Sequence, residues 1–145
     1  MNFAFGQSEH ERIDVDVRSY ERPVSGEYYD DNWLVVSITV SVRGFSGRAR
    51  ASILTHELVA FSDQLHTLYE KLKGAAEFST LEGQLSLRLE GNGKGNITLA
   101  GEVLDKAGSD NRLSFTLDFD QTLLQQSIHE LDSVLQAFPV RHAKA

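Results

Sequence analysis

The chain has 145 residues, of which 41% are hydrophobic and 24% charged, so it can bury one core but is too short for two ordinary domains. It contains no cysteine, which excludes disulfides, thiolate metal sites and thiol nucleophiles. Its net charge of −7 opposes nucleic-acid binding, because such a field repels a polyanion.

The charge is unevenly distributed along the chain. The first 31 residues contain eight acidic side chains against Arg12, Arg18 and Arg22. This acidity is either ordinary solubility charge or a surface that attracts a basic partner. The N-terminal segment MNFAFGQSEHERID has no pattern of a signal peptide, and no run of about 18 apolar residues occurs, so we expect neither export nor a membrane span.

Alternating apolar residues predict strands in the first third of the chain. Ile13, Val15 and Val17 alternate with polar residues and predict a strand, which a loop at 21–26 follows. A longer alternation from Leu34 to Val42 predicts a central strand. Turn residues at 43–47 and a further alternation at 49–53 predict a hairpin.

Helical spacing then replaces the strand period. Leucines and a phenylalanine recur at helical spacing from Thr55 to Leu72, so we expect a helix that Thr55 caps and Gly74 ends. A second helix is predicted from Asp120, its cap, to the residue before Pro139. Between the helices, glycine-containing turns separate three predicted strands, which should form an antiparallel meander: 85–89, 97–103 and 113–119.

These elements predict an α+β fold in a single domain, residues 1–145. We expect a mainly antiparallel β-sheet with two amphipathic α-helices packed on one face and a frayed tail at 141–145. The other face would be solvated or a docking surface, with these polar residues: Ser37, Thr39, Ser41, Arg48, Arg50, Ser86, Arg88, Thr98, Ser114, Thr116 and Asp118.

Motifs for catalysis are incomplete. The segment GNGKG at 91–95 lies between two predicted strands, whereas a phosphate-binding loop precedes a helix. His56-Glu57 lacks the second histidine of a metalloprotease helix, since position 60 is Ala60. There is no Gly-x-Ser-x-Gly motif. We therefore expect no enzymatic activity, no catalytic residues, no metal and no cofactor.

The segment YYDDNWLVV at 28–36 is the most distinctive in the chain. Tyr29 to Leu34, the strand that follows, the glycine hairpin and the Leu54-Thr55 entry to the helix resemble the WapI-type immunity family. One departure is Phe45, which stands where that family often has tryptophan.

The resemblance implies a cytoplasmic protein that binds the toxic C-terminal domain of a cognate effector and blocks it. Several such toxins are basic nucleases, which the net charge of −7 would attract. No small cofactor is implied, and the oligomeric state stays open.

Within the quoted segment, we expect Tyr28, Tyr29, Asp30 and Asp31 to contact the partner, because exposed aromatics beside carboxylates are a usual interface composition. The two carboxylates should face water at the strand entrance. Asn32 and Trp33 are expected anchors: the Asn32 side chain would tie the turn, and the Trp33 ring would be buried with its N–H bonded to backbone.

An alternative interpretation from another class remains. The chain could be a small-ligand binding module or a hydrolase that uses Asp30, Asp31 and a histidine such as His56 in a cleft. That interpretation predicts a deep pocket with converging titratable groups.

Overall fold

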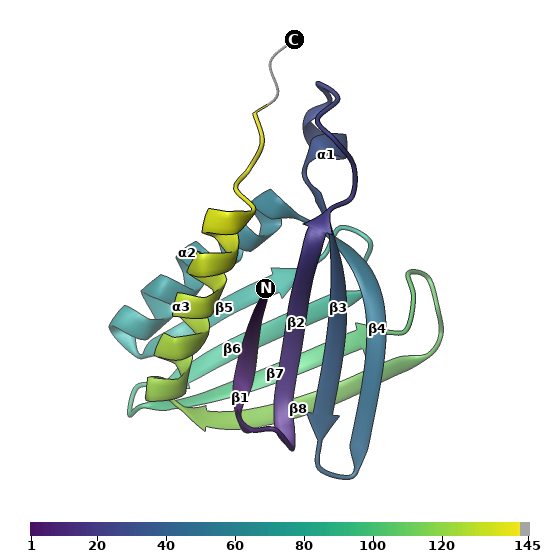
Figure 1. The fold of residues 1–145 in the computed structure, drawn as a ribbon. Helices are drawn as coiled ribbons and strands as arrows, with labels where there is room; N and C mark the ends of the chain where they lie inside the picture. The colour runs from purple at the N-terminus through teal and green to yellow at the C-terminus, as the bar shows by residue number, and fades with distance from the viewer. Residues whose placement is uncertain (143–145) are drawn as a thin grey trace.

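The computed structural model describes residues 1–142, in which eight strands and three helices follow one another (Figure 1). In chain order they are β1 (Asn2–Ser8), β2 (Glu11–Tyr20), α1 (Tyr28–Asp31), β3 (Trp33–Val42), β4 (Phe45–Leu54), α2 (Thr55–Lys71), β5 (Lys73–Ser79), β6 (Leu85–Asn92), β7 (Asn96–Leu104), β8 (Arg112–Asp120) and α3 (Gln121–Ala137). Apart from the short α1, each half of the chain thus consists of four strands and a long helix.

The strands form two antiparallel sheets and not the single sheet that was expected. One has the order β1-β2-β3-β4 and the other β5-β6-β7-β8. The α+β class with antiparallel pairing is confirmed. The reason for the second sheet is that α2, 17 residues long, carries the chain away from β4, so β5 starts a new sheet. Figure 1 shows the strands of the two sheets running in clearly different directions.

The core lies between the inner faces of the two sheets and the two long helices. Phe5 of β1 is at its centre, with its ring centroid 5.9 Å from that of Phe61 on α2 and 6.4 Å from that of Phe119 on β8. Burying a side chain of this size stabilises the fold by about 1.5–3 kcal/mol. Because these three aromatics come from both halves of the chain, the halves fold around a common core.

The two long helices pack together along one side of the sheets. The apolar stripes predicted for them are buried on α2 at Leu58, Phe61, Leu65 and Leu68, and on α3 at Leu124, Ile128 and Leu131. However, α2 lies mainly against β5 and α3 against β1, so the helices do not share one face of one sheet. They close the side of the core where the edge strands β1 and β5 lie.

The cap of α3 was predicted correctly, whereas α2 was predicted with the right extent, to within a residue, but with the wrong residues at its two ends. Asp120 accepts a hydrogen bond from the Thr122 N–H at 2.9 Å and so caps α3. The cap of α2 is Leu54, whose N–H donates to the Glu57 carboxylate at 3.0 Å. Thr55 is already helical, and its hydroxyl donates to the Asn32 carbonyl at 3.1 Å.

Helix α2 ends at Lys71, before the expected Gly74. Leu72 adopts a left-handed conformation with φ 60° and stops the helix. Its carbonyl accepts a hydrogen bond from the Gly93 N–H at 2.8 Å. A Cβ at Gly91 would lie 2.5 Å from that carbonyl oxygen, so only glycine allows the β6–β7 hairpin to reach the helix end.

The expected polar face is divided between two surfaces. Its residues are all outside the core, yet those on β3 and β4 face out from the first sheet and those on β6, β7 and β8 from the second. They therefore do not make one continuous field, and any docking surface on either sheet is smaller than the sequence indicated.

Candidate functional site

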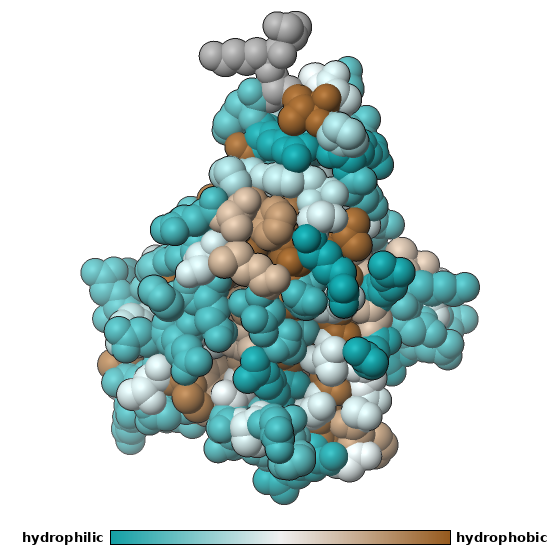
Figure 2. Space-filling model, viewed as in Figure 1, coloured by the Kyte–Doolittle hydropathy of each residue, from teal (hydrophilic) through white to brown (hydrophobic). Residues whose placement is uncertain are grey.

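The four residues expected to contact a partner form α1, beyond the end of the first sheet. Figure 1 shows α1 in the connection between β2 and β3, beside the chain that follows α3. In the space-filling view this end of the molecule is a narrow projection from the body of the protein (Figure 2). Its two tyrosines are open to solvent: Tyr28 is 39% exposed and Tyr29 58%.

Two histidines join these tyrosines in a cluster that we call the aromatic cap: Tyr28, Tyr29, His56 and His142. The Tyr28 ring stacks on His56 at 5.5 Å between centroids and lies 6.0 Å from His142. Tyr29 meets Tyr28 edge-on at 5.7 Å and His56 edge-on at 5.5 Å. Such packing holds large rings in place while their outer faces remain accessible.

Asp31 does not face water, contrary to expectation. Its side chain has no exposed surface. One carboxylate oxygen accepts hydrogen bonds from the Ser25 hydroxyl and the Ser25 N–H, both at 2.8 Å, and the other accepts one from the Gly26 N–H at 3.0 Å. Asp31 therefore fixes the loop that precedes α1, and partner contact stays a prediction only for Tyr28, Tyr29 and Asp30.

The environment of Asp31 keeps the carboxylate charged. Burial alone would raise the pKa of Asp31. The hydrogen bonds from Ser25 and Gly26 and the charge of Arg141 together lower the pKa by more than burial raises it, so it lies below its ordinary value. A buried carboxylate is tolerated here because the donors replace the lost water.

Asn32 connects α1 to the chain after α3. Its amide N–H groups donate to the Tyr28 carbonyl at 2.8 Å and the Arg141 carbonyl at 3.0 Å, and its oxygen accepts from the Arg141 N–H at 2.7 Å. Asn32 is fully buried. The tail expected to fray at 141–145 is thus held at Arg141, and residues 143–145 lie outside the described residues.

Trp33 differs from its expected role. It begins β3 and is only half-buried. Its backbone carbonyl accepts a hydrogen bond from the Glu21 N–H at 2.8 Å. Within residues 1–142 the indole N–H has no protein partner, so the expected bond to backbone is absent. The buried polar anchor of the segment is Asn32.

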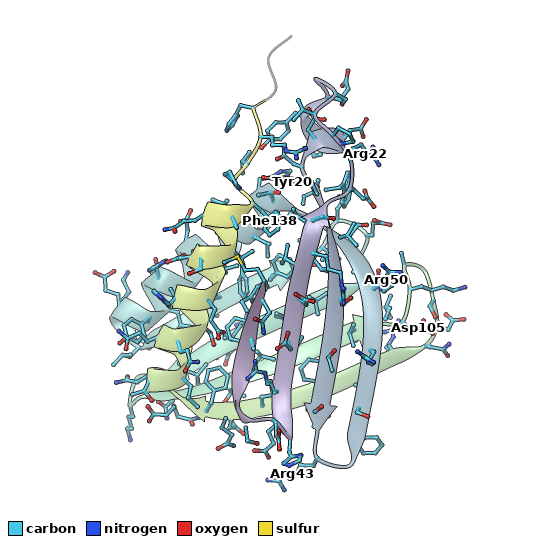
Figure 3. The ribbon with its side chains drawn as sticks, in the orientation of Figure 1. Tyr20, Arg22, Arg43, Arg50, Asp105 and Phe138 are labelled. Atoms are coloured by element: carbon cyan, nitrogen blue, oxygen red, sulfur yellow. The ribbon has the colours of Figure 1, made fainter. Side chains whose placement is uncertain are left out.

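A second contact fixes the same tail at the base of the projection, where Figure 3 labels Tyr20, Arg22 and Phe138. The Arg141 guanidinium lies 3.5 Å from the centroid of the Tyr20 ring and donates to the Arg22 carbonyl at 3.0 Å. The Tyr20 hydroxyl donates to the Pro139 carbonyl, and its ring packs edge-on against Phe138. Burial raises the pKa of Tyr20 despite the opposing charge of Arg141.

Most acids in the first 31 residues have a cation of the same protein beside them. Arg22 lies 3.2 Å from Asp30 and 3.4 Å from Glu21, and Arg43 lies 2.7 Å from Glu11. Arg12 and Arg18 pair with Asp14 and Asp16. Among the arginines of these pairs, Arg43 alone lies outside the first 31 residues, so the segment keeps an excess of negative charge although most of its acids have a cation nearby.

The carboxylate and histidine cleft has no support in the described residues. Asp31 is engaged by the loop, and Asp30 pairs with Arg22. Among residues 1–142, no group of three His, Asp or Glu side chains is arranged to hold a metal ion.

No helix of the described chain is long and apolar enough to cross a membrane.

Sequence reasoning missed Tyr20, Arg141 and His142 at this end of the molecule, and it named His56 only in the hydrolase alternative. Tyr20, His56 and the adjacent pair Arg141 and His142 come from three separate places in the chain, and only the fold brings them to α1. The one available signal was the density of aromatics in the quoted segment.

Solved structures resemble this fold at low sequence identity. One is described as "Crystal structures of trypanosoma bruciei MRP1/MRP2", with a TM-score of 0.53 and 14% identity, over 94% of this chain and 84% of that chain. At that identity the similarity concerns the fold alone. No curated protein matches this chain at a significant level. The model of the immunity protein WapI-like family matches residues 4–139, and the chain therefore belongs to that family.

Proposed function

We propose that this protein binds the C-terminal toxin domain of a cognate effector and neutralises it, without catalysis, by occluding the toxin with the aromatic cap. Membership of an immunity family supports a protein toxin as the partner. The choice of this surface rests on the two exposed tyrosines that pack against His56, Tyr28 by stacking and Tyr29 edge-on. A cytoplasmic location remains a prediction from the family resemblance.

The cap is suited to binding because its base is already ordered. Asp31 fixes the loop before α1, and Asn32 and Tyr20 hold the tail that brings His142 to the cluster. Large aromatic side chains contribute most of the energy at many protein interfaces. When such side chains are held before binding, less conformational entropy is lost on association.

We propose in addition that the toxin is basic. The net charge of −7 favours encounter with a cationic domain. Near the cap, Glu27 is exposed and unpaired within residues 1–142, and Asp30 shares Arg22 with Glu21. These carboxylates would act mainly on the association rate.

The test is binding of the toxin domain that co-purifies with this protein or is encoded beside it. Tyr28→Ala with Tyr29→Ala should weaken the affinity by at least about 10-fold, as expected for interface aromatics. The control is Phe45→Ala, which removes a 70% exposed aromatic from the β3–β4 hairpin at the opposite end of the sheet. Equal affinities for the tyrosine variant and wild type, measured by calorimetry, would place the toxin on another surface.

The basic character of the toxin has its own test. Glu27→Lys with Asp30→Lys should slow association several-fold at low salt, and the difference should diminish as salt increases. If the rates of the variant and wild type agree at every ionic strength, the charge argument is wrong while the aromatic contact can still hold.

A further inference from the structure

A groove on the outer face of the first sheet gathers positive charge on this acidic protein. It lies between the sheet and the loop after β7, has a volume of about 690 Å³ and is open to solvent. Figure 3 shows Arg50 on β4 and Asp105 in that loop on the same side of the molecule. The lining includes Ser37, Thr39, Arg48, Arg50, Asp105 and Lys106.

Three of its cations form no salt bridge with the described part of the chain. Within residues 1–142, no carboxylate lies within 4.0 Å of Arg48, Arg50 or Lys106. This contrasts with the other arginines of the sheets, such as Arg88, which contacts both Glu77 and Glu90. Uncompensated cations close together repel one another, so a negatively charged occupant would relieve this repulsion.

The only acid in the groove does not neutralise it. Asp105 accepts a hydrogen bond from the Asn111 side chain at 3.1 Å within its own loop. The side-chain hydrogen bonds of Ser109 and Asn111 lower the pKa of Asp105. Asp105 also interacts with the charge of the adjacent Lys106, whereas Arg48 and Arg50 form no salt bridge with it.

The spacing of the arginines matches an extended peptide. Arg48 and Arg50 are two residues apart on the same face of β4, which separates their Cα atoms by roughly 6.6 Å. Alternate side chains of an extended segment have the same spacing. A guanidinium group also binds a carboxylate through two parallel hydrogen bonds, and the Ser37 and Thr39 hydroxyls supply further donors.

We propose that this groove binds an extended acidic segment of a protein partner, with carboxylates at alternate positions that pair with Arg48 and Arg50. The segment lies over the face of the sheet. It does not add a strand at the β4 edge, because the Gln84 side chain already donates to the Arg50 carbonyl there, at 2.6 Å. The surface is separate from the aromatic cap and does not depend on the cap binding a toxin.

A nucleic acid is the less suitable polyanion for this groove. None of its lining residues is aromatic, so the stacking that anchors single-stranded bases is missing. The net charge of −7 also repels a long polyanion more than a short acidic peptide.

Titration of the full chain by NMR tests the proposal with three probes. The first is a peptide of alternating glutamate and serine, the second has the same composition with its glutamates in one block, and the third is an oligothymidylate of equal charge. The alternating peptide should bind tightest and shift the amide signals around Arg48, Arg50 and Lys106. Absence of binding, or shifts spread over the surface, would overturn the proposal.

Paired variants separate groove binding from general charge. Arg48→Gln with Arg50→Gln should weaken the alternating peptide at least about 10-fold. Arg88→Gln with Lys94→Gln removes the same formal charge outside the groove and should have less than about a 2-fold effect. Equal losses in both, or tighter oligothymidylate binding that depends on Arg48 and Arg50, would reject an acidic peptide as the ligand. The Tyr28→Ala, Tyr29→Ala variant should bind the peptide like wild type. A failure of the toxin proposal can therefore be told apart from a failure of the groove proposal.

Discussion

Asn32 and Arg141 are 109 positions apart in the sequence, yet the side-chain amide of one forms two hydrogen bonds with the backbone of the other, at 2.7 and 3.0 Å. The amide thus pairs with both backbone groups of one residue, as the opposite residue of an antiparallel strand would. Since Asn32 also bonds the Tyr28 carbonyl, the start of α1 and the end of the described chain are held by a single side chain.

Replacing Asn32 with alanine should therefore affect both segments. The Arg141 N–H and the two carbonyls would lose their partner, and a lost buried hydrogen-bonding group costs about 1–3 kcal/mol. We expect the free energy of unfolding to fall by that amount and the Arg141 amide to exchange faster with solvent. The control Asn2→Ala removes an exposed bond to Asp14 and should change stability by less than about 0.5 kcal/mol. Similar exchange of Arg141 in both variants would contradict the role of Asn32.

Asp31 makes stability depend on acid pH. Because its pKa is lower in the folded chain than in the unfolded chain, the unfolded chain binds more protons, and stability rises with pH. The contribution of the Asp31 carboxylate to stability is complete above the ordinary aspartate pKa of about 4. It is lost as pH falls through the lower pKa that Asp31 has in the folded chain. Asp31→Asn should flatten this acid limb of the curve of unfolding free energy against pH.

The matched control for that measurement is Asp30→Asn, a neighbouring carboxylate that is half-exposed and paired with Arg22. At neutral pH, Asp31→Asn should be the less stable of the two, because an amide offers donors where Ser25 and Gly26 already donate. Parallel acid limbs in wild type and Asp31→Asn would show that this carboxylate does not govern the transition.

Glu57 should have the opposite pH effect. Burial raises its pKa, more than its hydrogen bonds and the nearby His56 lower it. The folded chain therefore binds more protons than the unfolded chain, and the contribution to stability falls as pH rises from the ordinary glutamate pKa, about 4.3, through the raised value. Glu57→Gln keeps an acceptor for the Leu54 N–H but has no charge to bury.

The free energy of unfolding of Glu57→Gln, taken relative to wild type, should consequently be higher at about pH 7 than at about pH 3. Denaturant unfolding at these two pH values measures the difference. Glu70→Gln, an exposed change on the same helix, serves as the control. A constant difference between Glu57→Gln and wild type at both pH values would refute the assigned cause.

Periodicity predicted the regular elements well where apolar residues repeat many times, as in β3 and α3. It failed for β5, Lys73–Ser79, whose glycine and alanines have low strand propensity and which exists because it pairs with β6. It also failed to separate the two sheets, since alternation shows which side of a strand is buried and not which sheet covers it.

The candidate site was predictable only in part for a related reason. The exposed tyrosines follow from their polar surroundings in the chain, whereas the burial of Asp31 depends on donors from Ser25 and Gly26 that only the folded loop supplies. A carboxylate is normally exposed, so the sequence alone favours the wrong environment for it. The contribution of Arg141 depends on the path of the chain after α3.

Phe5 offers a test of whether the two sheets share one core. It is 1% exposed and contacts Phe61 and Phe119, which belong to α2 and the second sheet. Phe5→Ala should lower the free energy of unfolding by about 3–5 kcal/mol, because the cavity opens where both halves meet. Unfolding should remain a single transition by both fluorescence of Trp33 in the first sheet and circular dichroism of the whole chain. The exposed Phe45→Ala should be nearly neutral. Two separate transitions in the Phe5 variant would show that each sheet, with its helix, is stable without the other.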